Sequence, residues 1–144
     1  MATQNFANHR QFVPMFHGVL FGILLLTLIG SCVNLSHNWG DHAVMYSASL
    51  IVVLVIASIM IALFARVFAL KAQDRAIRAE ENLRHFVLTG KLLDPRLEVG
   101  QIIALRFASD AEMPGLAAKA AQDGIKPADI KKSIKSWRPD FYRV

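Results

Sequence analysis

The side chains best suited to metal chemistry are three histidines at the two ends of an apolar stretch. His37 and His42 lie in one short polar segment, and paired imidazoles can hold a metal ion or a haem. No cysteine or carboxylate cluster accompanies them, and His17 lies at the opposite end of the apolar stretch. We therefore expect no metal site and no cofactor, and interpret His17 as an interfacial residue.

The carboxylates Asp110 and Glu112 are spaced closely enough for an acid–base pair. However, Ser109-Asp110-Ala111-Glu112 also matches a capping box, in which a hydroxyl and a carboxylate satisfy free backbone N–H groups at a helix start. We therefore predict a helix from Asp110 to Asp123. The sequence contains no H-E-x-x-H, C-x-x-C, G-x-G-x-x-G, phosphate-binding loop or G-x-S-x-G motif. We expect no catalytic residue and no enzymatic activity.

The single cysteine, Cys32, excludes an internal disulfide. The run Ile29-Gly30-Ser31-Cys32 is similar to the site at which bacterial lipoproteins are cleaved and lipidated. The apolar run before it is long for a signal peptide, and only one arginine precedes that run. We expect a cysteine buried in the membrane, with lipidation as the alternative.

Two apolar stretches, 13–35 and 43–65, are each 23 residues long. At 1.5 Å per residue, a helix of that length crosses a hydrocarbon core of about 30 Å. Residues 36–42 form the turn between them, in which Trp39 is typical of an interfacial anchor, as is Tyr46 beyond it. No glycine or proline follows the second stretch until Gly90. The pattern predicts one helix that spans the membrane and continues into water as far as His85.

The basic residues are distributed very unevenly along the chain. Of 16 lysines and arginines, Arg10 alone precedes Arg66. This is the positive-inside pattern, and it predicts both termini in the cytoplasm and the short turn outside. The net charge of +5 therefore reflects topology, and we expect no binding to nucleic acid. The predicted organisation is a tail (1–12), a transmembrane hairpin (13–65) and a cytoplasmic helical domain (66–144).

The cytoplasmic domain is predicted to be all-helical, so that the whole chain is all-α. Gly90 caps the long helix, and residues 89–98 form a break before a short helix over 99–107. Gly124 ends the helix that follows. Pro127 opens a last helix that runs to about Trp137.

Small residues on the spans predict close helix packing. Gly18 and Gly22 are four apart with Gly30 on the same face, and the second span offers Ser58 and Ala62. Such spacing lets two helices approach closely in lipid. We favour packing between the two spans of one chain, with packing between chains as the alternative.

An apolar stripe follows the long helix out of the membrane. At 100° per residue one face carries Phe64, Phe68, Ala72, Ala76, Ala79, Leu83, Phe86 and Val87. We expect the C-terminal part of the chain to cover this stripe, or else a partner to do so. The predicted interface residues are Phe64, Phe68, Leu83, Phe86 and Trp137.

Basic side chains are the candidates for contact with lipid headgroups. Arg66 is the first charge after the second span and can extend its side chain to the headgroup level. Lys131, Lys132 and Lys135 share one side of the last predicted helix. This side either faces anionic headgroups or is simply solvated.

Short motifs occur at 4–9 (QNFANH), at 64–66 (FAR) with 69–75 (ALKAQDR), at 105–110 (LRFASD) and at 137–140 (WRPD). Together they resemble those of an uncharacterised family of small bacterial two-span membrane proteins, a domain of unknown function. The resemblance implies the architecture and the bacterial inner membrane, but no activity. Our leading hypothesis is a non-enzymatic protein that associates with copies of itself or with other membrane subunits. The second is a regulator that responds to lipid or to a ligand.

Overall fold

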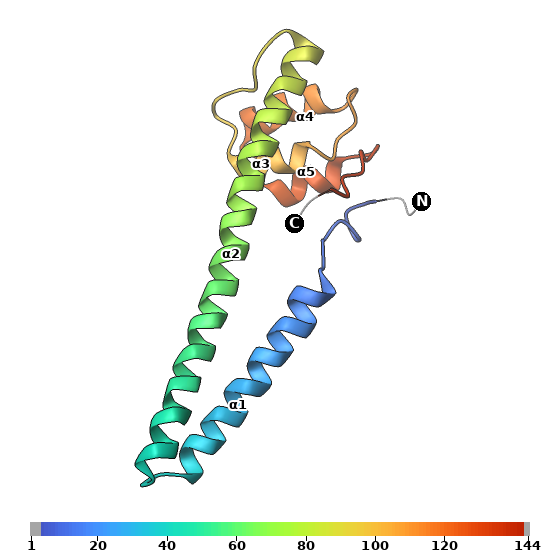
Figure 1. The fold of residues 1–144 in the computed structure, drawn as a ribbon. Helices are drawn as coiled ribbons and strands as arrows, with labels where there is room; N and C mark the ends of the chain where they lie inside the picture. Colours follow the sequence, from blue (N-terminus) through green and yellow to red (C-terminus); the bar gives the residue numbers. More distant parts are fainter. Residues whose placement is uncertain (1–3, 143–144) are drawn as a thin grey trace. The chain divides into compact units, whose positions relative to one another are not determined.

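The all-α prediction is confirmed by the computed structural model, which describes residues 4–142 and is 70% helical without a strand in that range. The helical elements are a π-helical segment, η1 (Met15–Leu20), and five α-helices (Figure 1). These are α1 (Phe21–His37), α2 (His42–Thr89), α3 (Val99–Leu105), α4 (Met113–Asp123) and α5 (Pro127–Ser133). The chain divides into two compact units, residues 12–68 and residues 1–11 with 69–144.

The first unit contains a helical hairpin whose helices are long and apolar enough to cross a membrane. Met15–His37 is 23 residues long with a mean hydropathy of 2.2, and the most apolar window of α2 reaches 2.9. The turn occupies 38–41 and is shorter than the predicted 36–42. Asp41 explains the earlier start of α2, because its carboxylate accepts hydrogen bonds from the backbone N–H groups of Ala43 (3.1 Å) and Val44 (3.2 Å).

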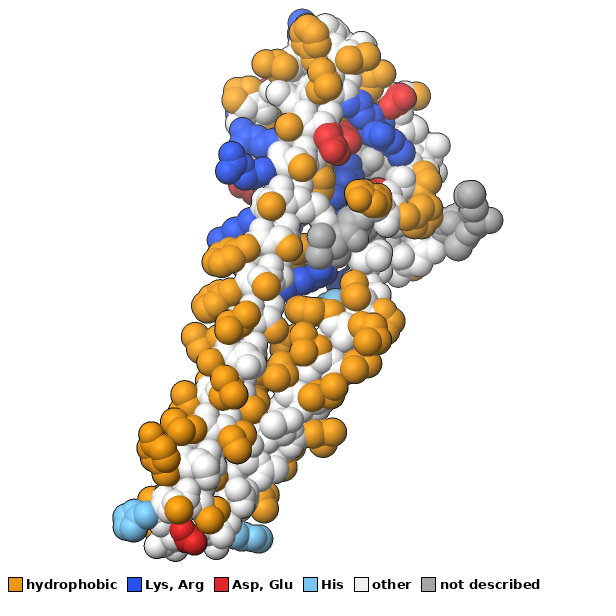
Figure 2. Space-filling view, viewed as in Figure 1, with side chains coloured by type: hydrophobic (Ala, Val, Ile, Leu, Met, Phe, Trp, Pro, Cys, Tyr) orange, Lys and Arg blue, Asp and Glu red, His pale blue; other side chains and the backbone are white. Residues whose placement is uncertain are grey.

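The hairpin packs closely beside its turn and opens away from it (Figure 1). Ser31, Ala48 and Val55 are the buried residues of this unit. A Cβ atom on Gly18, Gly22 or Gly30 would meet no atom within 4 Å, so these glycines do not pack against α2 as we favoured. Figure 2 shows apolar side chains over the visible surface of the hairpin.

Helix α2, the second of the two helices long and apolar enough to cross a membrane, continues without interruption, as predicted, and ends just before Gly90, the expected cap. Gly90 ends α2 with a left-handed backbone (φ +72°), and its N–H donates to the carbonyl of Phe86 at 2.7 Å. This geometry needs no Cβ, which is why glycine suits it. The segment after Gly90 is held against α2 by Asn82, whose side-chain oxygen accepts a hydrogen bond from the Leu93 N–H at 2.9 Å.

The helical domain is built around α3, which packs against both α4 and α5. Its core consists of apolar residues from these helices and their connections, with Leu105, Phe107, Met113 and Ile130 the largest that are fully buried. Seven-residue helices such as α3 are marginal by themselves. Tertiary packing around Phe107 therefore stabilises this domain.

The predicted capping box at Ser109 and Glu112 is wrong. Helix α4 starts at Met113, and its N-cap residue Glu112 makes no capping hydrogen bond with its side chain. Instead the Glu112 carboxylate accepts a hydrogen bond from the Ser136 N–H at 3.1 Å. The capping box of this domain lies at α3, between Glu98 and Gln101.

The last helix is shorter than predicted. Helix α5 ends at Ser133, and Ile134 has an extended backbone. The chain then pairs with the segment after α3, through an isolated antiparallel bridge between Ala108 and Trp137. The Arg138 N–H donates to the Phe107 carbonyl at 2.8 Å, so the chain at Trp137 and Arg138 docks on the domain, whereas Phe141 and Tyr142 are exposed.

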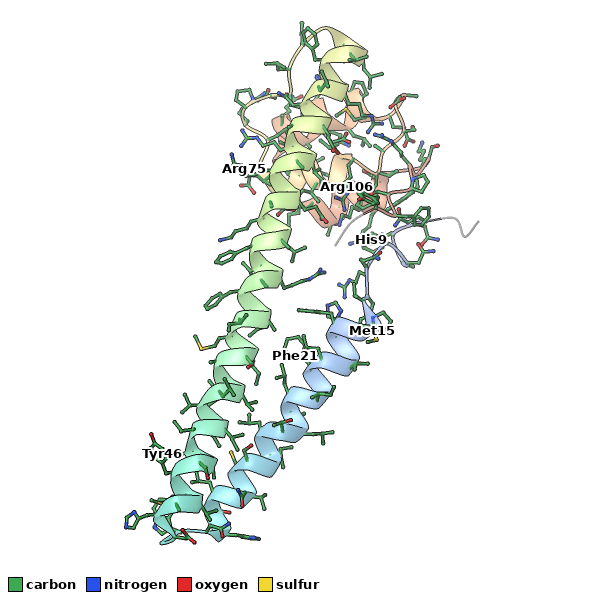
Figure 3. The ribbon with its side chains drawn as sticks, in the orientation of Figure 1. His9, Met15, Phe21, Tyr46, Arg75 and Arg106 are labelled. Carbon is green, nitrogen blue, oxygen red and sulfur yellow. The ribbon has the colours of Figure 1, made fainter. Side chains whose placement is uncertain are left out.

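The domain packs on a face of α2 other than the predicted apolar stripe. Buried Ile77 and Glu81 face the domain, whereas Leu83 is 64% and Val87 75% exposed. Figure 3 shows Arg75 pointing away from the helical domain. The prediction that the C-terminal part of the chain covers the apolar stripe is wrong, because polar contacts attach that part to the neighbouring face.

Candidate functional site

A network of ion pairs joins α2 to the chain after α3. Arg84 donates to the Glu81 carboxylate (2.9 Å), to Asp110 (2.7 Å) and to the Ala108 carbonyl (2.7 Å). The Arg138 guanidinium lies 3.5 Å from the other oxygen of Glu81. Glu81 is only 5% exposed, so its charge depends on these two arginines.

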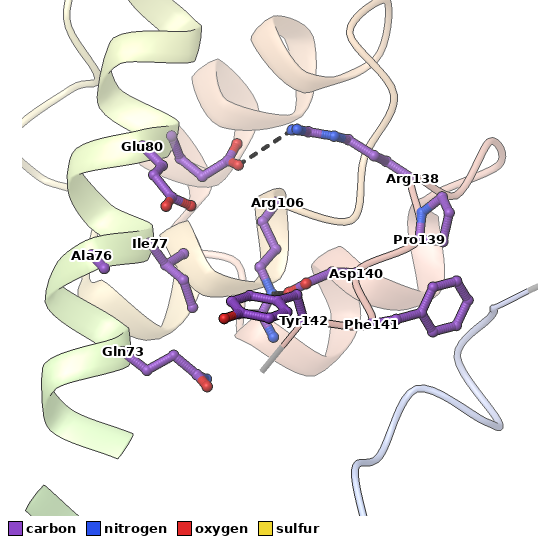
Figure 4. Close-up of a pocket in the computed structure, with 11 residues that line it drawn as sticks. Gln73, Ala76, Ile77, Glu80, Arg106, Arg138, Pro139, Asp140, Phe141 and Tyr142 are labelled. Carbon is purple, nitrogen blue, oxygen red and sulfur yellow. Dashed lines mark ion pairs between the residues drawn. The ribbon is translucent and has the colours of Figure 1, made fainter. Parts of the chain in front are cut away.

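Beside this network, α2 and the C-terminal segment line an open pocket of about 590 Å³ (Figure 4). Gln73, Ala76, Ile77, Glu80 and Glu81 come from α2. The opposite wall is made by 138–142, and Arg106 follows α3. Figure 4 shows the side chains of Gln73 and Ile77 directed towards Arg106, while Phe141 points away.

Arg106 is the buried cation of this pocket. It is 7% exposed, its Nε lies 3.3 Å from the Asp140 carboxylate, and its guanidinium lies 4.6 Å from the centre of the Phe107 ring. A cation over an aromatic face is attracted by the ring's quadrupole. Packing and charge therefore hold Arg106 in place, whereas Arg138, at 53% exposure, is free to adjust.

The N-terminal tail docks on the same domain. The side chain of Gln4 accepts from the Asp140 N–H (2.8 Å) and donates to the Asp140 carbonyl (3.3 Å). The ring of His9 lies 5.7 Å from Phe107 and 5.9 Å from Trp137. The described part of the tail, residues 4–11, is therefore an ordered part of the domain rather than a frayed end.

Trp137 was predicted to contact a partner and Lys131 to contact lipid headgroups. Both side chains instead contact residues of their own domain. Trp137 packs against Phe107, with ring centres 5.1 Å apart. The Lys131 Nζ lies 3.1 Å from His9 and 5.4 Å from the centre of the Phe107 ring. Lys132 and Lys135 are exposed, but Lys135 lies beyond the end of α5. The three lysines thus do not form one helical face.

The remaining predicted contact residues lie in the hairpin. Phe64 and Phe68 are exposed, and Arg66 lies 5.9 Å from the centre of the Phe16 ring. Ser58 donates to the Leu54 carbonyl of its own helix at 2.8 Å. Ala62 is half-buried.

The histidines nearest the turn are His37 and His42. Among residues 4–142, no group of three or more histidine, cysteine or acidic side chains is placed to hold a metal ion. His42 lines an open groove of about 560 Å³ with Trp39, Met45 and Tyr46. Tyr46 points away from the helix (Figure 3).

The sequence alone did not reveal the pocket. Its arginines and acids are spread between residues 80 and 140, and no local motif joins them. The available signal was the pair of charged motifs at 105–110 and 137–140, whose backbones the structure brings side by side.

Together these features define an all-α protein with two helices suited to crossing a membrane and a small helical domain. A family model, described as Family of unknown function (DUF6526), matches residues 1–144, and the chain belongs to that family. No curated protein and no solved structure matches the chain.

Proposed function

We propose that this chain is a non-enzymatic integral membrane protein that acts by association. Its partner is a second copy or a larger membrane complex in which it is an accessory subunit. The observation that carries the proposal is the exposure of the apolar stripe on α2. Leu83, Phe86 and Val87 are 64%, 48% and 75% exposed in the part of α2 that carries charged residues. Contiguous apolar surface of this kind is typical of interaction sites.

The small residues of the hairpin support the same proposal. A side chain at Gly18, Gly22 or Gly30 would meet no atom beyond its own stretch of helix within 4 Å of its Cβ, so the surface beside these glycines is open to a helix from another chain. Of the two hypotheses for the face that carries these glycines, we therefore retain packing between chains.

The proposed location is the bacterial inner membrane, with both termini in the cytoplasm. The support is the placement of 15 of the 16 lysines and arginines from Arg66 onwards. Single cysteines at Ser36 and Ser136, in a Cys32→Ser background, can be labelled in intact cells with an impermeant maleimide. We expect labelling at position 36 only. Labelling at position 136 and not at position 36 would contradict the proposed topology.

The test of association compares two exposed positions on one helix. Leu83→Glu should dissociate the complex, because it puts a charge in the proposed interface, while Arg78→Glu on the polar side should not. Native size is measured by size-exclusion chromatography with light scattering, corrected for detergent, on protein extracted at native abundance. Co-eluting chains distinguish an accessory subunit from a homo-oligomer. A mass near 16.0 kDa for the unmodified chain, repeated in nanodiscs, would refute the proposal.

A second candidate is a regulator that reads anionic headgroups through its basic C-terminal segment. The exposure of Lys132 and Lys135 favours it, although Lys131 faces His9. Full-length protein in nanodiscs should then bind anionic vesicles in a salt-sensitive manner, and Lys132→Gln with Lys135→Gln should weaken that binding. Equal binding by this double variant would exclude the second candidate.

A further inference from the structure

The pocket beside α2 gathers charges of both signs around one cavity of about 590 Å³. It is lined by the arginines Arg106 and Arg138 and the carboxylates Glu80, Glu81 and Asp140. Two positive and three negative charges leave a formal sum of −1. We propose that this pocket binds a phosphate group with an attached ammonium, as in phosphoethanolamine.

The two arginines suit the phosphate. A guanidinium presents its N–H donors in a planar fork that matches phosphate oxygens. Arg138 Nη1 lies 3.5 Å from Glu81, which is longer than the 2.7–2.9 Å of a strong charge-assisted hydrogen bond. Arg138 can turn to a phosphate while Arg84 keeps its 2.9 Å ion pair with Glu81, and Arg106 stays fixed against Phe107.

The carboxylates explain why the ligand needs a positive charge as well. Glu81 is held by Arg84 at 2.9 Å and Asp140 by Arg106 at 3.3 Å, but Glu80 forms no ion pair within the described part of the chain. A phosphate alone would add negative charge beside these acids. An ammonium on the same ligand offsets that repulsion and gives exposed Glu80 a partner.

Two sources supply this chemistry. One is the headgroup of a phosphatidylethanolamine lipid, since Gln73 in the pocket wall follows Arg66 by only seven residues. The other is a soluble phosphoethanolamine ester.

The test uses Trp137 as a reporter, since it directly precedes Arg138. Full-length protein with Trp39→Phe, which leaves Trp137 as the one tryptophan, is placed in phosphatidylglycerol nanodiscs. Its fluorescence is measured as phosphatidylethanolamine replaces part of the lipid, and separately as glycerophosphoethanolamine is added in solution. We expect a saturable change in at least one series. A change with the lipid alone assigns the headgroup, and a change with the soluble ester shows that the membrane is not required.

Three variants locate the response. Arg138→Gln and Glu80→Gln are changes at exposed positions of the pocket, and each should weaken apparent affinity by about tenfold, the effect of one charge-assisted hydrogen bond. Arg78→Gln, exposed on the same helix but outside the pocket, should have no effect. Circular dichroism of each variant should match that of the parent protein. The proposal is overturned if neither series changes the fluorescence, or if both pocket variants respond as the parent does.

Discussion

Removal of Arg84 should destabilise the helical domain, because Arg84 is the nearer of the two cations that pair with buried Glu81. Arg84→Met leaves Glu81 buried with Arg138 as its remaining ion-pair partner at 3.5 Å, and it takes a donor from the Ala108 carbonyl. The pair with Asp110 adds little, because that side chain is 69% exposed and screened by water. Breaking a buried ion pair lowers the free energy of unfolding by about 3–5 kcal/mol. Because Arg138 still pairs with Glu81, we expect a loss at the lower end, about 3 kcal/mol.

The assay is urea unfolding of the full chain in mild detergent, followed by Trp137 fluorescence in a Trp39→Phe background. Trp137 packs against the core, so its emission reports on the helical domain. The control is Glu80→Gln, which changes an exposed neighbour and should alter the free energy of unfolding by less than about 0.5 kcal/mol.

A double-mutant cycle tests the stated cause. Adding Glu81→Gln to Arg84→Met removes the stranded charge, so the double variant should lose at least about 1 kcal/mol less than the sum of the single losses. If the two losses simply add, or if Arg84→Met unfolds like Glu80→Gln, the buried pair does not stabilise the domain.

The same unfolding assay should give a loss of about 3–5 kcal/mol for Phe107→Ala, because the ring is fully buried. Gly124→Ala should cost about 1 kcal/mol since φ is +63° there, whereas Gly115→Ala inside α4, with open space around it, should gain a similar amount. Hydrogen bonding from the Arg96 side chain lowers the pKa of Asp94 from 3.8 to about 2. Its stabilising effect is therefore present above pH 3.8 and is lost as the pH falls through 2, with no further change at neutral pH. Carboxyl NMR titration should show that midpoint and its return towards 3.8 in Arg96→Gln, and an unmoved midpoint would contradict the cause.

The helices could be predicted because their signals are local. A run without charge, a proline at a helix start and a glycine at a helix end act through the residue itself and its nearest turn. Gly90 and Gly124 end their helices with positive φ, as the sequence indicated. The site could not be predicted in this way, because Glu81, Arg106 and Asp140 meet only after the domain has folded.

The capping box shows how a local pattern fails. Ser109 and Glu112 have the right types and spacing, yet the Glu112 carboxylate binds the Ser136 N–H from a distant segment. The pattern that does form, Glu98 with Gln101, begins with a residue that is less typical of a cap. The contact of Glu112 with Ser136 thus takes the place of the local bond that the predicted box required.

The two faces of α2 explain why the apolar stripe was misassigned. Hydrophobic periodicity identifies the face that avoids water, but it does not say which molecule covers that face. In this domain Ile77 is buried, Arg84 donates to Asp110 and to the Ala108 carbonyl, and Glu81 forms an ion pair with Arg138. Directional bonds fix the position of a small domain on a helix, because each requires a particular partner atom. The domain is thereby attached through the polar face of α2, and Leu83 and Val87 remain available for association with another chain.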